Sequence, residues 1–304
     1  MPFVLPPEWE VLRETGRLLT DVPMSSHTTL KIGGKADVLA DPADETELAM
    51  LLRVAAGAGL PVAVVGRGSN LVVRDGGIRG VTIRIAARFG GISVQGGTIG
   101  AMAGTSLSAL AVFAANAGLS GLEAVSGIPG TVGGGIIMNA GAYGHDLGET
   151  VMSVRGIMPD GASFSYTGEQ MGFGYRISRL QGTAAVVTGA DFTLAHADKT
   201  EILGQMEAYN ARRREKQPLD MPNCGSVFKR PEGYYAGTLI ESCGLKGLRV
   251  GCCEVSRMHA GFIVNTGGAT ADDFLRLMEL VRLKVHEQTG VLLEPEVTVL
   301  GEGL

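Results

Sequence analysis

The residues best suited to chemistry in this sequence lie in two glycine-rich segments. Residues 124–148 contain eight glycines, no lysine, arginine or glutamate, and a single carboxylate, Asp146. Glycine lets a backbone approach a partner closely, and exposed main-chain N–H groups with no carboxylate nearby suit a phosphate anion. A second cluster, Gly-Arg-Gly-Ser-Asn at residues 66–70, lies upstream. Two such loops in one chain predict a large cofactor that contains a diphosphate.

The upstream cluster follows residues 61–65, which read as a buried strand. It differs from the dinucleotide fingerprint of Rossmann folds, because Leu71 occupies the place of the third glycine. Residues 71–77 read as an extended piece and a turn, so no helix is expected after the loop. A plain glycine turn is the alternative interpretation, and the second glycine segment favours phosphate binding over it.

Three polar side chains outside these loops are candidates for catalysis. Arg176 follows Tyr175, and in a strand the two would face opposite sides; its guanidinium could clamp a carboxylate in a bidentate manner, or simply lie at the surface. Ser226 stands on a glycine turn and could be a nucleophile, a proton donor or a turn residue. No GxSxG elbow is present, so hydrolase chemistry is unsupported. Glu296 begins a valine-rich strand, where a carboxylate is either paired or at an edge.

Metal binding is not expected from the histidines and cysteines. The five histidines are scattered without HxxxH or HxH spacing, and His259 could be a ligand contact or a packed side chain. The four cysteines form no CxxC pair, and the adjacent Cys252 and Cys253 suit a structural zinc site poorly. Free thiols in a reducing cytosol are the expectation.

Composition excludes several classes of protein. The chain has 304 residues, of which 45% are hydrophobic, and this suffices for two domains or one large one. A net charge of −5 argues against non-specific binding of nucleic acid. Residues 89–122 carry no charge, but glycines interrupt them, so they read as strands and one buried helix rather than a membrane span. The first residues lack the pattern of a signal peptide.

Periodicity and capping signals predict an α+β chain. Helices are expected at residues 44–59, 105–118, 201–214 and 272–288. The candidate caps are Asp44 or Thr46, Thr105 or Ser106, and Thr270. Gly290 is expected to end the last helix, with an apolar stripe of Phe274, Met278, Val281 and Val285. A half-buried strand is expected at residues 81–85, and further strands at residues 186–187, 192–194, 261–265 and 296–300. The basic end of the third helix and the prolines after it mark a candidate domain boundary, so domains of 1–200 and 201–304 are expected.

These pieces, in this order, resemble the family of UDP-N-acetylenolpyruvoylglucosamine reductases, flavoenzymes of peptidoglycan precursor synthesis. The resemblance runs from about residue 20 to residue 301, and six motifs carry it. They are His27-Thr-Thr29 with Gly33-Gly34, Gly66-x-Gly-Ser-Asn70, Gly127-Ile-Pro-Gly-Thr-Val-Gly133 with Asn139-Ala-Gly-Ala-Tyr143, Tyr175-Arg176, Gly225-Ser226-Val-Phe228, and Leu293-Glu-Pro-Glu-Val297.

The resemblance implies an FAD-binding domain of the vanillyl-alcohol-oxidase (PCMH) type at residues 1–200, in two α+β lobes of about 1–85 and 86–200. It implies a C-terminal α+β substrate-binding domain at residues 201–304, whose last strand could pack back toward the FAD domain. It also implies a cytoplasmic enzyme of cell-wall biogenesis, and so a link to cell shape and cell division, without a membrane, nucleic-acid or obligate protein partner.

The implied reaction uses NADPH to reduce FAD, and reduced flavin to deliver hydride to C3 of the enolpyruvyl ether; a proton at C2 then gives UDP-N-acetylmuramate. Ser226 would be the proton donor, and Arg176 and a protonated Glu296 would act on the substrate carboxylate. Tyr175, Lys216 and His259 would contact the substrate. The FAD contacts implied are Gly66, Arg67, Gly68, Ser69, Asn70, Leu71, Gly127, Ile128, Pro129, Gly130, Thr131, Gly133, Gly134, Asn139, Ala140 and Gly141.

The chain departs from one branch of this family. The segment between Arg176 and the strand expected from residue 186 contains little more than Ser-Arg-Leu-Gln-Gly-Thr, at residues 178–183. It is too short for the tyrosine-bearing loop that some members fold over the substrate, and Tyr175 could take part of that role.

Two other functions stay open. One is an oxidase on the same scaffold, which covalent flavin attachment would favour, although His145 is the only histidine or cysteine in either glycine segment. The other is a nucleotide-binding regulator, which would not need Ser226 or Glu296.

Overall fold

A computed structural model describes residues 5–303, and the chain divides into two compact units. The first contains the residues up to Thr20, Val38–Arg67 and Gly80–Arg212; the second contains Asp21–Asp37, Gly68–Arg79 and the residues from Arg213 onward. Each unit has its own hydrophobic core, with Trp9, Phe89 and Phe192 in the first and Phe274 and Leu277 in the second. The units are therefore discontinuous in sequence. The predicted division into domains of residues 1–200 and 201–304 stays a prediction.

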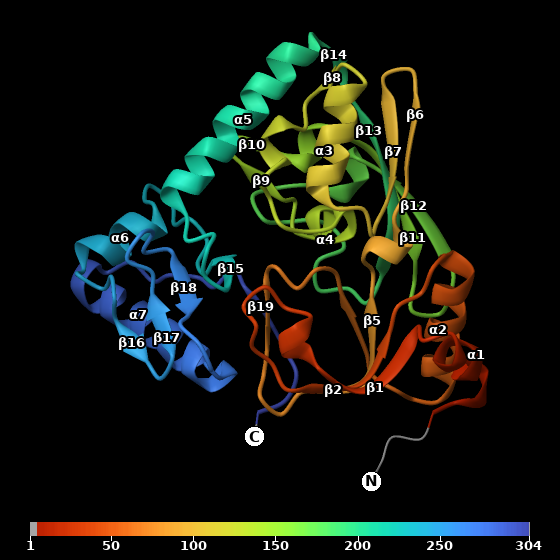
Figure 1. Cartoon of the computed structure of the whole chain (residues 1–304), viewed down its shortest axis with the longest axis horizontal. Coiled ribbons are helices and arrows are strands. Elements are labelled where there is room, and N and C mark those ends of the chain that lie inside the picture. The colour runs from red at the N-terminus through yellow and green to blue at the C-terminus, as the bar shows by residue number, and fades with distance from the viewer. Residues whose placement is uncertain (1–4, 304) are drawn as a thin grey trace. The chain divides into compact units, whose positions relative to one another are not determined.

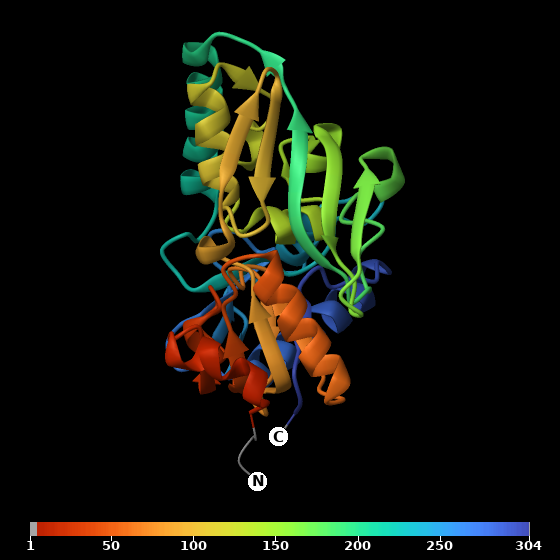
Figure 2. The same ribbon diagram turned by 90° about the vertical axis from the view of Figure 1, so that its right-hand side faces the viewer.

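A five-stranded antiparallel sheet forms the larger part of the first unit (Figure 1). Its order is β12 (Ser163–Thr167), β11 (Val151–Ile157), β13 (Val186–Thr193), β7 (Thr98–Met102) and β6 (Ile92–Gln95). Strand β13 joins the two short strands expected at 186–187 and 192–194 into one. Helices α3 (Leu107–Asn116) and α5 (Lys199–Lys216) lie on the same side of this sheet (Figure 2).

A smaller sheet has the order β1 (Leu18–Pro23), β2 (Lys35–Ala40), β5 (Ile78–Arg84) and β3 (Val62–Val65). Strands β3 and β5 pair in parallel. Two burial expectations were wrong here. Val62 and Val64 of β3 are each 39% exposed, because one face of this edge strand meets solvent. In β5, Thr82 is buried as well as Val81 and Ile83, so both faces of the strand are covered instead of one.

The remaining elements of the first unit are short, apart from α2 and α5. Asp44 caps α2 (Glu45–Gly57) and Ser106 caps α3 through side-chain oxygens that accept from main-chain N–H groups, and each is one of the two candidates predicted for its helix. The others are η1 (Pro7–Trp9), α1 (Glu10–Glu14), η3 (Ala87–Phe89), β8 (Leu119–Ser120), η4 (Glu123–Val125), α4 (Val132–Ile137), β9 (Gly141–Ala142), β10 (His145–Asp146), η5 (Leu147–Glu149), η6 (Glu169–Met171) and β14 (Ala195–His196).

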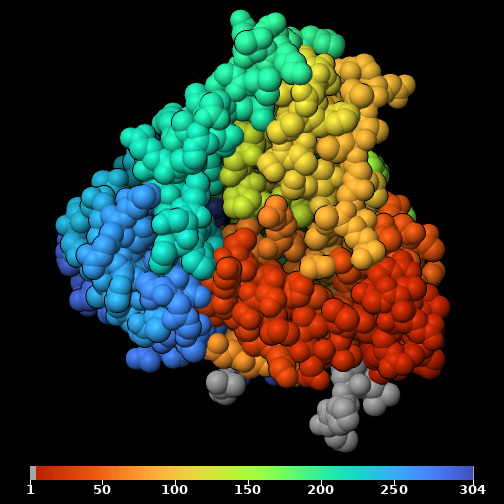
Figure 3. All heavy atoms as spheres, viewed as in Figure 1, coloured from red at the N-terminus to blue at the C-terminus, as the bar shows by residue number. Residues whose placement is uncertain are grey.

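Helix α5 is polar and buries only Ile202 and Met206 along its length. The space-filling view agrees, since the teal spheres of α5 lie at the surface (Figure 3). None of the helices in the described part of the chain combines the length and the apolar character needed to span a bilayer.

The second unit is built on the antiparallel sheet β15 (Asn223–Ser226), β18 (Phe262–Asn265), β17 (Cys253–Val255) and β16 (Arg249–Val250). Helices α6 (Ala236–Ser242) and α7 (Ala271–Thr289) and the single turn η2 (Met24–Ser26) belong to it. Thr270 and Asp273 form a capping box on α7, and Gly290 ends it at φ 73°. Leu277, rather than the expected Met278, joins Phe274 in the buried stripe of this helix.

A parallel pair of strands joins distant parts of the sequence inside the second unit. Strand β4 (Leu71–Val73) follows the first glycine loop, and β19 (Thr298–Leu300) is the last strand of the chain. Thr298 pairs with Leu71 and Leu300 with Val73. The strand predicted from residue 296 begins two residues later, which leaves Glu296 in the irregular segment before it.

Candidate functional site

The first glycine loop is the turn between β3 and β4, and as predicted no helix follows it. Its main-chain N–H groups are open: in the described structure, those of Arg67, Gly68, Ser69 and Asn70 donate to no protein acceptor. Four neighbouring donors without acceptors are unusual unless a ligand or water satisfies them. The loop therefore has the chemistry that an anionic group needs.

Gly68 fixes the shape of this loop. Its φ is +65°, and a Cβ placed there would lie 2.3 Å from the main-chain oxygen of His27. The N–H of Thr29 donates to the Gly68 oxygen at 3.1 Å. A side chain at Gly68 would therefore both strain the backbone and push away the His27–Thr29 segment.

The second glycine segment begins as a turn at residues 127–131 and continues into α4. The side-chain oxygen of Thr131 accepts from the N–H of Gly134 at 3.4 Å and so caps that helix. The N–H groups of Gly127, Gly130 and Thr131 have no protein acceptor among the described residues. A Cβ on Gly66 would lie 2.7 Å from Thr131 Oγ1, so the start of the first loop packs directly against the second.

Some glycines of the second segment have a packing role. A Cβ on Gly133 would meet the Cβ of Ala103 at 3.1 Å, and one on Gly135 would meet Leu147 at 2.8 Å. These glycines let α4 lie close to its neighbours, as small residues do at tight helix contacts. The contacts predicted between FAD and these loops remain predictions; the open N–H groups and the Gly66–Thr131 contact fit its diphosphate.

Arg176 lies in a turn and not in a strand, so the strand geometry that would place it and Tyr175 on opposite sides does not apply. Gly174 and Ile177 form a two-way main-chain pair at 3.1 Å, which leaves Tyr175 and Arg176 as a two-residue turn with φ 57° at Arg176. The guanidinium carbon lies 5.0 Å from the centre of the Tyr175 ring. Nη2 of Arg176 donates to the main-chain oxygen of Gly141 at 3.1 Å.

Asn139 holds this turn against the second glycine segment. It is 1% exposed, and its amide nitrogen donates to the Gly174 oxygen at 2.9 Å while its amide oxygen accepts from the Gly148 N–H at 2.8 Å. Nη1 of Arg176 lies 3.4 Å from the Asn139 main-chain oxygen. The structure thus joins three of the predicted site residues, Asn139, Gly141 and Arg176, within the first unit.

Ser226 and Glu296 lie on neighbouring segments of the second unit. The Glu296 N–H donates to the Val227 oxygen at 2.8 Å, one residue after Ser226. Gly225, at φ +81°, lies in the irregular part of β15, between the pairs that Asn223 makes with Val264 and Ser226 makes with Phe262. Both site residues are half-buried, and the Ser226 hydroxyl has no protein partner in the described structure. An unpaired, half-buried hydroxyl is available to a substrate.

Sequence reasoning assigned no role to Thr29 and Asn223, which connect these parts of the second unit. The Thr29 hydroxyl donates to the Asn223 oxygen at 2.7 Å, and the Asn223 side chain accepts from the Gly225 N–H at 3.0 Å. Thr29 thereby links the first glycine loop to the turn that carries Ser226. Nothing local in the sequence signals a contact between positions 194 residues apart.

The two other predicted substrate contacts also belong to the second unit. Lys216 is the exposed last residue of α5. His259 is half-buried; its Nδ1 accepts from the Gly261 N–H at 3.1 Å, and its ring meets Phe262 edge-on at 5.0 Å. Burial lowers the pKa of His259, and the nearby Lys246 acts in the same direction. His259 is thus held as the neutral imidazole, with Nε2 able to donate.

Cys224, the cysteine nearest to Ser226 in the sequence, is not a reactive thiol. Cys224 is buried, and burial raises the pKa of its thiol to about 12. Among the described residues, none of the four cysteines is in a disulfide, and no three histidine, cysteine, aspartate or glutamate side chains converge as a metal site.

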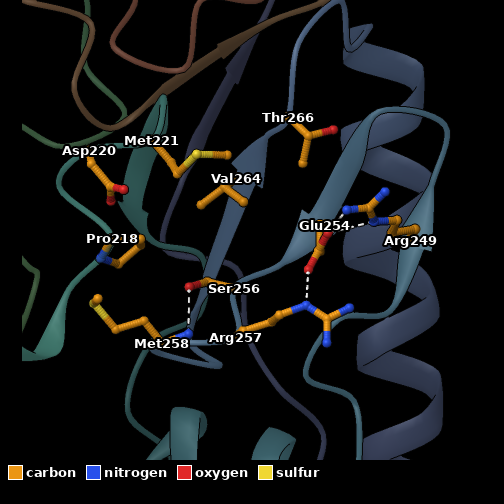
Figure 4. A pocket seen from close by; sticks show the side chains of 10 residues that line it. All are labelled: Pro218, Asp220, Met221, Arg249, Glu254, Ser256, Arg257, Met258, Val264 and Thr266. Carbon is orange, nitrogen blue, oxygen red and sulfur yellow. Dashed lines mark hydrogen bonds and ion pairs between the residues drawn. The ribbon is translucent and has the colours of Figure 1, made fainter.

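A cavity of about 380 Å³ in the second unit does not coincide with the predicted residues (Figure 4). Glu254 is buried in its wall and is paired with Arg249 and Arg257, the latter at 2.9 Å. With Asp220, these side chains carry two positive and two negative charges, so the cavity has no excess charge for a diphosphate. The lining residues are Pro218, Asp220, Met221, Arg249, Glu254, Ser256, Arg257, Met258, Val264 and Thr266.

Two family models match this chain, one in its N-terminal part and one in its C-terminal part. Residues 36–165 match the model of an FAD binding domain, and residues 217–300 match the model of the UDP-N-acetylenolpyruvoylglucosamine reductase C-terminal domain. UDP-N-acetylenolpyruvoylglucosamine reductase 2 of Symbiobacterium thermophilum is 48% identical over 96% of this chain and 94% of its own length. The chain belongs to the UDP-N-acetylenolpyruvoylglucosamine reductase family. The reductase of Levilactobacillus brevis is 45% identical over 94% of each chain.

Solved structures agree with this family and with the expected fold. UDP-N-acetylenolpyruvylglucosamine reductase from Thermus caldophilus superposes with a TM-score of 0.80 at 38% identity, over 92% of this chain and 98% of that one. Cholesterol oxidase from B. sterolicum matches with a TM-score of 0.50 at 18% identity, over 64% of this chain and 40% of that one, which concerns the fold alone. The predicted combination of a PCMH-type FAD-binding domain and the reductase C-terminal domain is confirmed.

Proposed function

We propose that this chain is an FAD-dependent oxidoreductase that uses NADPH to reduce the enolpyruvyl ether of UDP-N-acetylglucosamine to UDP-N-acetylmuramate. Family membership at 48% identity over nearly the whole chain supports the reaction and the cofactors. We further place the reaction in the cytoplasm, as a step that serves cell shape and cell division through peptidoglycan. The substrate is a sugar nucleotide, and no nucleic-acid or obligate protein partner is part of the proposal.

The observation that best supports the chemistry is the pairing of the Ser226 and Glu296 segments through the Val227–Glu296 hydrogen bond at 2.8 Å. FAD held at the two glycine loops would supply the hydride that comes from NADPH to C3 of the enolpyruvyl group. The negative charge that results spreads from C2 into the substrate carboxylate. A proton donor and a carboxylate-binding group are therefore both required beside C2.

The roles assigned to the side chains follow from this requirement. Ser226 Oγ donates the proton to C2, which completes the addition of one hydride and one proton across the double bond. Its lack of a protein partner leaves the hydroxyl available for this donation. Arg176 binds the substrate carboxylate through its guanidinium fork, and Glu296 in its protonated form donates to the same group. Tyr175, Lys216 and His259 hold the rest of the sugar nucleotide.

FAD itself is proposed to bind at the two glycine loops. The open N–H groups at residues 67–70 and at Gly127, Gly130 and Thr131 would hold its diphosphate. Gly66 and Thr131 lie in contact, which supports a joint role of the two loops. The other FAD contacts proposed from the family are Leu71, Ile128, Pro129, Gly133, Gly134, Asn139, Ala140 and Gly141.

Single-turnover kinetics of Ser226→Ala under anaerobic conditions test the proposal. We expect flavin reduction by NADPH to keep its normal rate, while reoxidation by the enolpyruvyl sugar nucleotide falls by about 10²- to 10⁴-fold, the usual contribution of a positioned acid. Ser242→Ala is the matched control, because that hydroxyl donates to the Leu239 oxygen within α6 and should leave both half-reactions unchanged. Normal reoxidation in Ser226→Ala would exclude Ser226 as the donor.

A further inference from the structure

Three residues of the first unit share an uncommon backbone geometry. Asn139, Tyr143 and Arg176 have φ values of 41°, 58° and 57°, and only two other non-glycine residues of the described chain have positive φ. Such conformations are strained and persist where the surrounding structure holds them in place. Asn139 is held by its own buried side chain. Tyr143 has a bulky ring and needs another source of support.

Tyr143 occupies the turn of the short hairpin formed by β9 and β10. Ala142 pairs with His145, so Tyr143 and Gly144 are the two turn residues, with φ 58° and 89°. Turns with two positive φ values favour Asn, Asp and Gly, so a tyrosine at the first position is unfavourable. Its presence there indicates that the ring has a contact that offsets the strain.

That contact is Tyr209 on α5, which runs beside β9 and β10 (Figure 1). The Tyr143 and Tyr209 rings are stacked, with centroids 4.4 Å apart and planes 5° from parallel. The Tyr143 hydroxyl donates to the Tyr209 main-chain oxygen at 3.0 Å, and the Arg212 guanidinium lies 4.9 Å from the Tyr143 ring centre. Gln205 donates to the Tyr209 hydroxyl at 3.1 Å. Side chains on one face of α5 thus hold the hairpin turn in place.

Main-chain oxygens at the start of the same hairpin bind Arg176. Gly141, the first residue of β9, accepts from Arg176 Nη2 at 3.1 Å, and Asn139 accepts from Nη1 at 3.4 Å. Displacement of the hairpin would therefore move the oxygens that orient the guanidinium. We propose that Tyr209 is a positioning residue for Arg176, which acts through the stacked Tyr143 and the main-chain oxygens of residues 139 and 141. The inference rests on the proposed role of Arg176 toward the substrate carboxylate.

Tyr209→Ala in the holoenzyme tests this role. Because a stacked aromatic pair corresponds to at most about a tenfold change in rate, we expect the half-reaction with the sugar nucleotide to slow about fivefold to tenfold. Flavin reduction by NADPH should keep its rate, since the open N–H groups at residues 67–70, 127, 130 and 131 lie outside the β9–β10 hairpin. Hydrogen exchange should rise at residues 139–148 and 174–178 and stay unchanged at residues 66–70.

Three further variants separate the stack from other effects. Tyr209→Phe keeps the ring and should restore the normal rate and exchange. Leu203→Ala changes an exposed residue of the same helix and should alter neither. Arg212→Gln should shift both readouts in the same direction as Tyr209→Ala but less, and it serves as the test should Tyr209→Ala not fold.

The outcomes also distinguish this inference from the proposed function. Unchanged exchange and an unchanged second half-reaction in Tyr209→Ala would overturn the positioning role. If Arg176→Lys nevertheless slowed that half-reaction, the proposed function would stand and the inference alone would fail. If Arg176→Lys and Ser226→Ala both reacted normally, the roles proposed for these two side chains would fail as well, whereas loss of the reaction with the sugar nucleotide in the original chain would overturn the proposed function.

Discussion

The side-chain amide of Asn70 donates to the main-chain oxygen of Glu296 at 3.1 Å, across 226 positions of sequence. The main-chain oxygen of the same asparagine accepts from the Thr298 N–H at 3.0 Å. One residue of the first glycine loop therefore holds the segment that presents a candidate catalytic carboxylate. Within the second unit, the loop proposed for FAD and the proposed substrate group are fixed to each other directly.

Asn70→Asp should be more damaging than Asn70→Ala. Alanine removes one hydrogen bond, worth about 0.5–1.5 kcal/mol of unfolding free energy. Aspartate places a carboxylate against the Glu296 carbonyl oxygen and leaves two acceptors facing each other, at a cost of about 1–3 kcal/mol. Urea unfolding of both variants measures the difference. Asn116→Ala, at the exposed end of α3, is the control and should change little; equal losses for Asp and Ala at position 70 would contradict the assigned donor.

Gly68→Ala should destabilise the chain and reduce its FAD content. The left-handed backbone costs an alanine about 1–2 kcal/mol, and the added Cβ would lie 2.3 Å from the His27 oxygen, so the total loss should exceed 2 kcal/mol. Thermal unfolding and the ratio of flavin to protein absorbance report the two effects. Gly204→Ala lies in α5, where the new Cβ would meet nothing within 4 Å among the described residues beyond the helix's own backbone, and should instead stabilise by about 0.5–1 kcal/mol. A stable, flavin-replete Gly68→Ala protein would refute the assigned role of this glycine.

Stability should fall in acid partly because of His259. Burial lowers its folded-state pKa below the ordinary 6.5, so the unfolded chain binds the proton more readily. This contribution is constant above pH 6.5 and is lost as the pH falls from 6.5 through the folded-state pKa. His259→Asn keeps an acceptor for the Gly261 N–H and should flatten the pH profile of the unfolding free energy between pH 7 and pH 5. Identical slopes for the variant and the original chain would assign that acid sensitivity to other groups.

Local signals in the sequence were sufficient where the structure depends on neighbouring residues. The caps Asp44, Ser106 and Thr270 and the stop Gly290 set the helix ends, because capping involves residues within one turn. The absence of a helix after the first glycine loop was also predicted correctly. Errors appeared where burial depends on what covers a face: Val62 and Val64 of β3 are exposed, and both faces of β5 are covered.

The sequence by itself determined the family, the two glycine-rich loops and the helix caps, because glycine spacing and capping residues act over a few positions. Only the tertiary structure decided which of them meet: Gly66 with Thr131, Asn70 with Glu296, Thr29 with Asn223, and Tyr143 with Tyr209. Such pairs are separated by tens to hundreds of residues. Their formation depends on how the whole backbone packs, and no local pattern of residues encodes it.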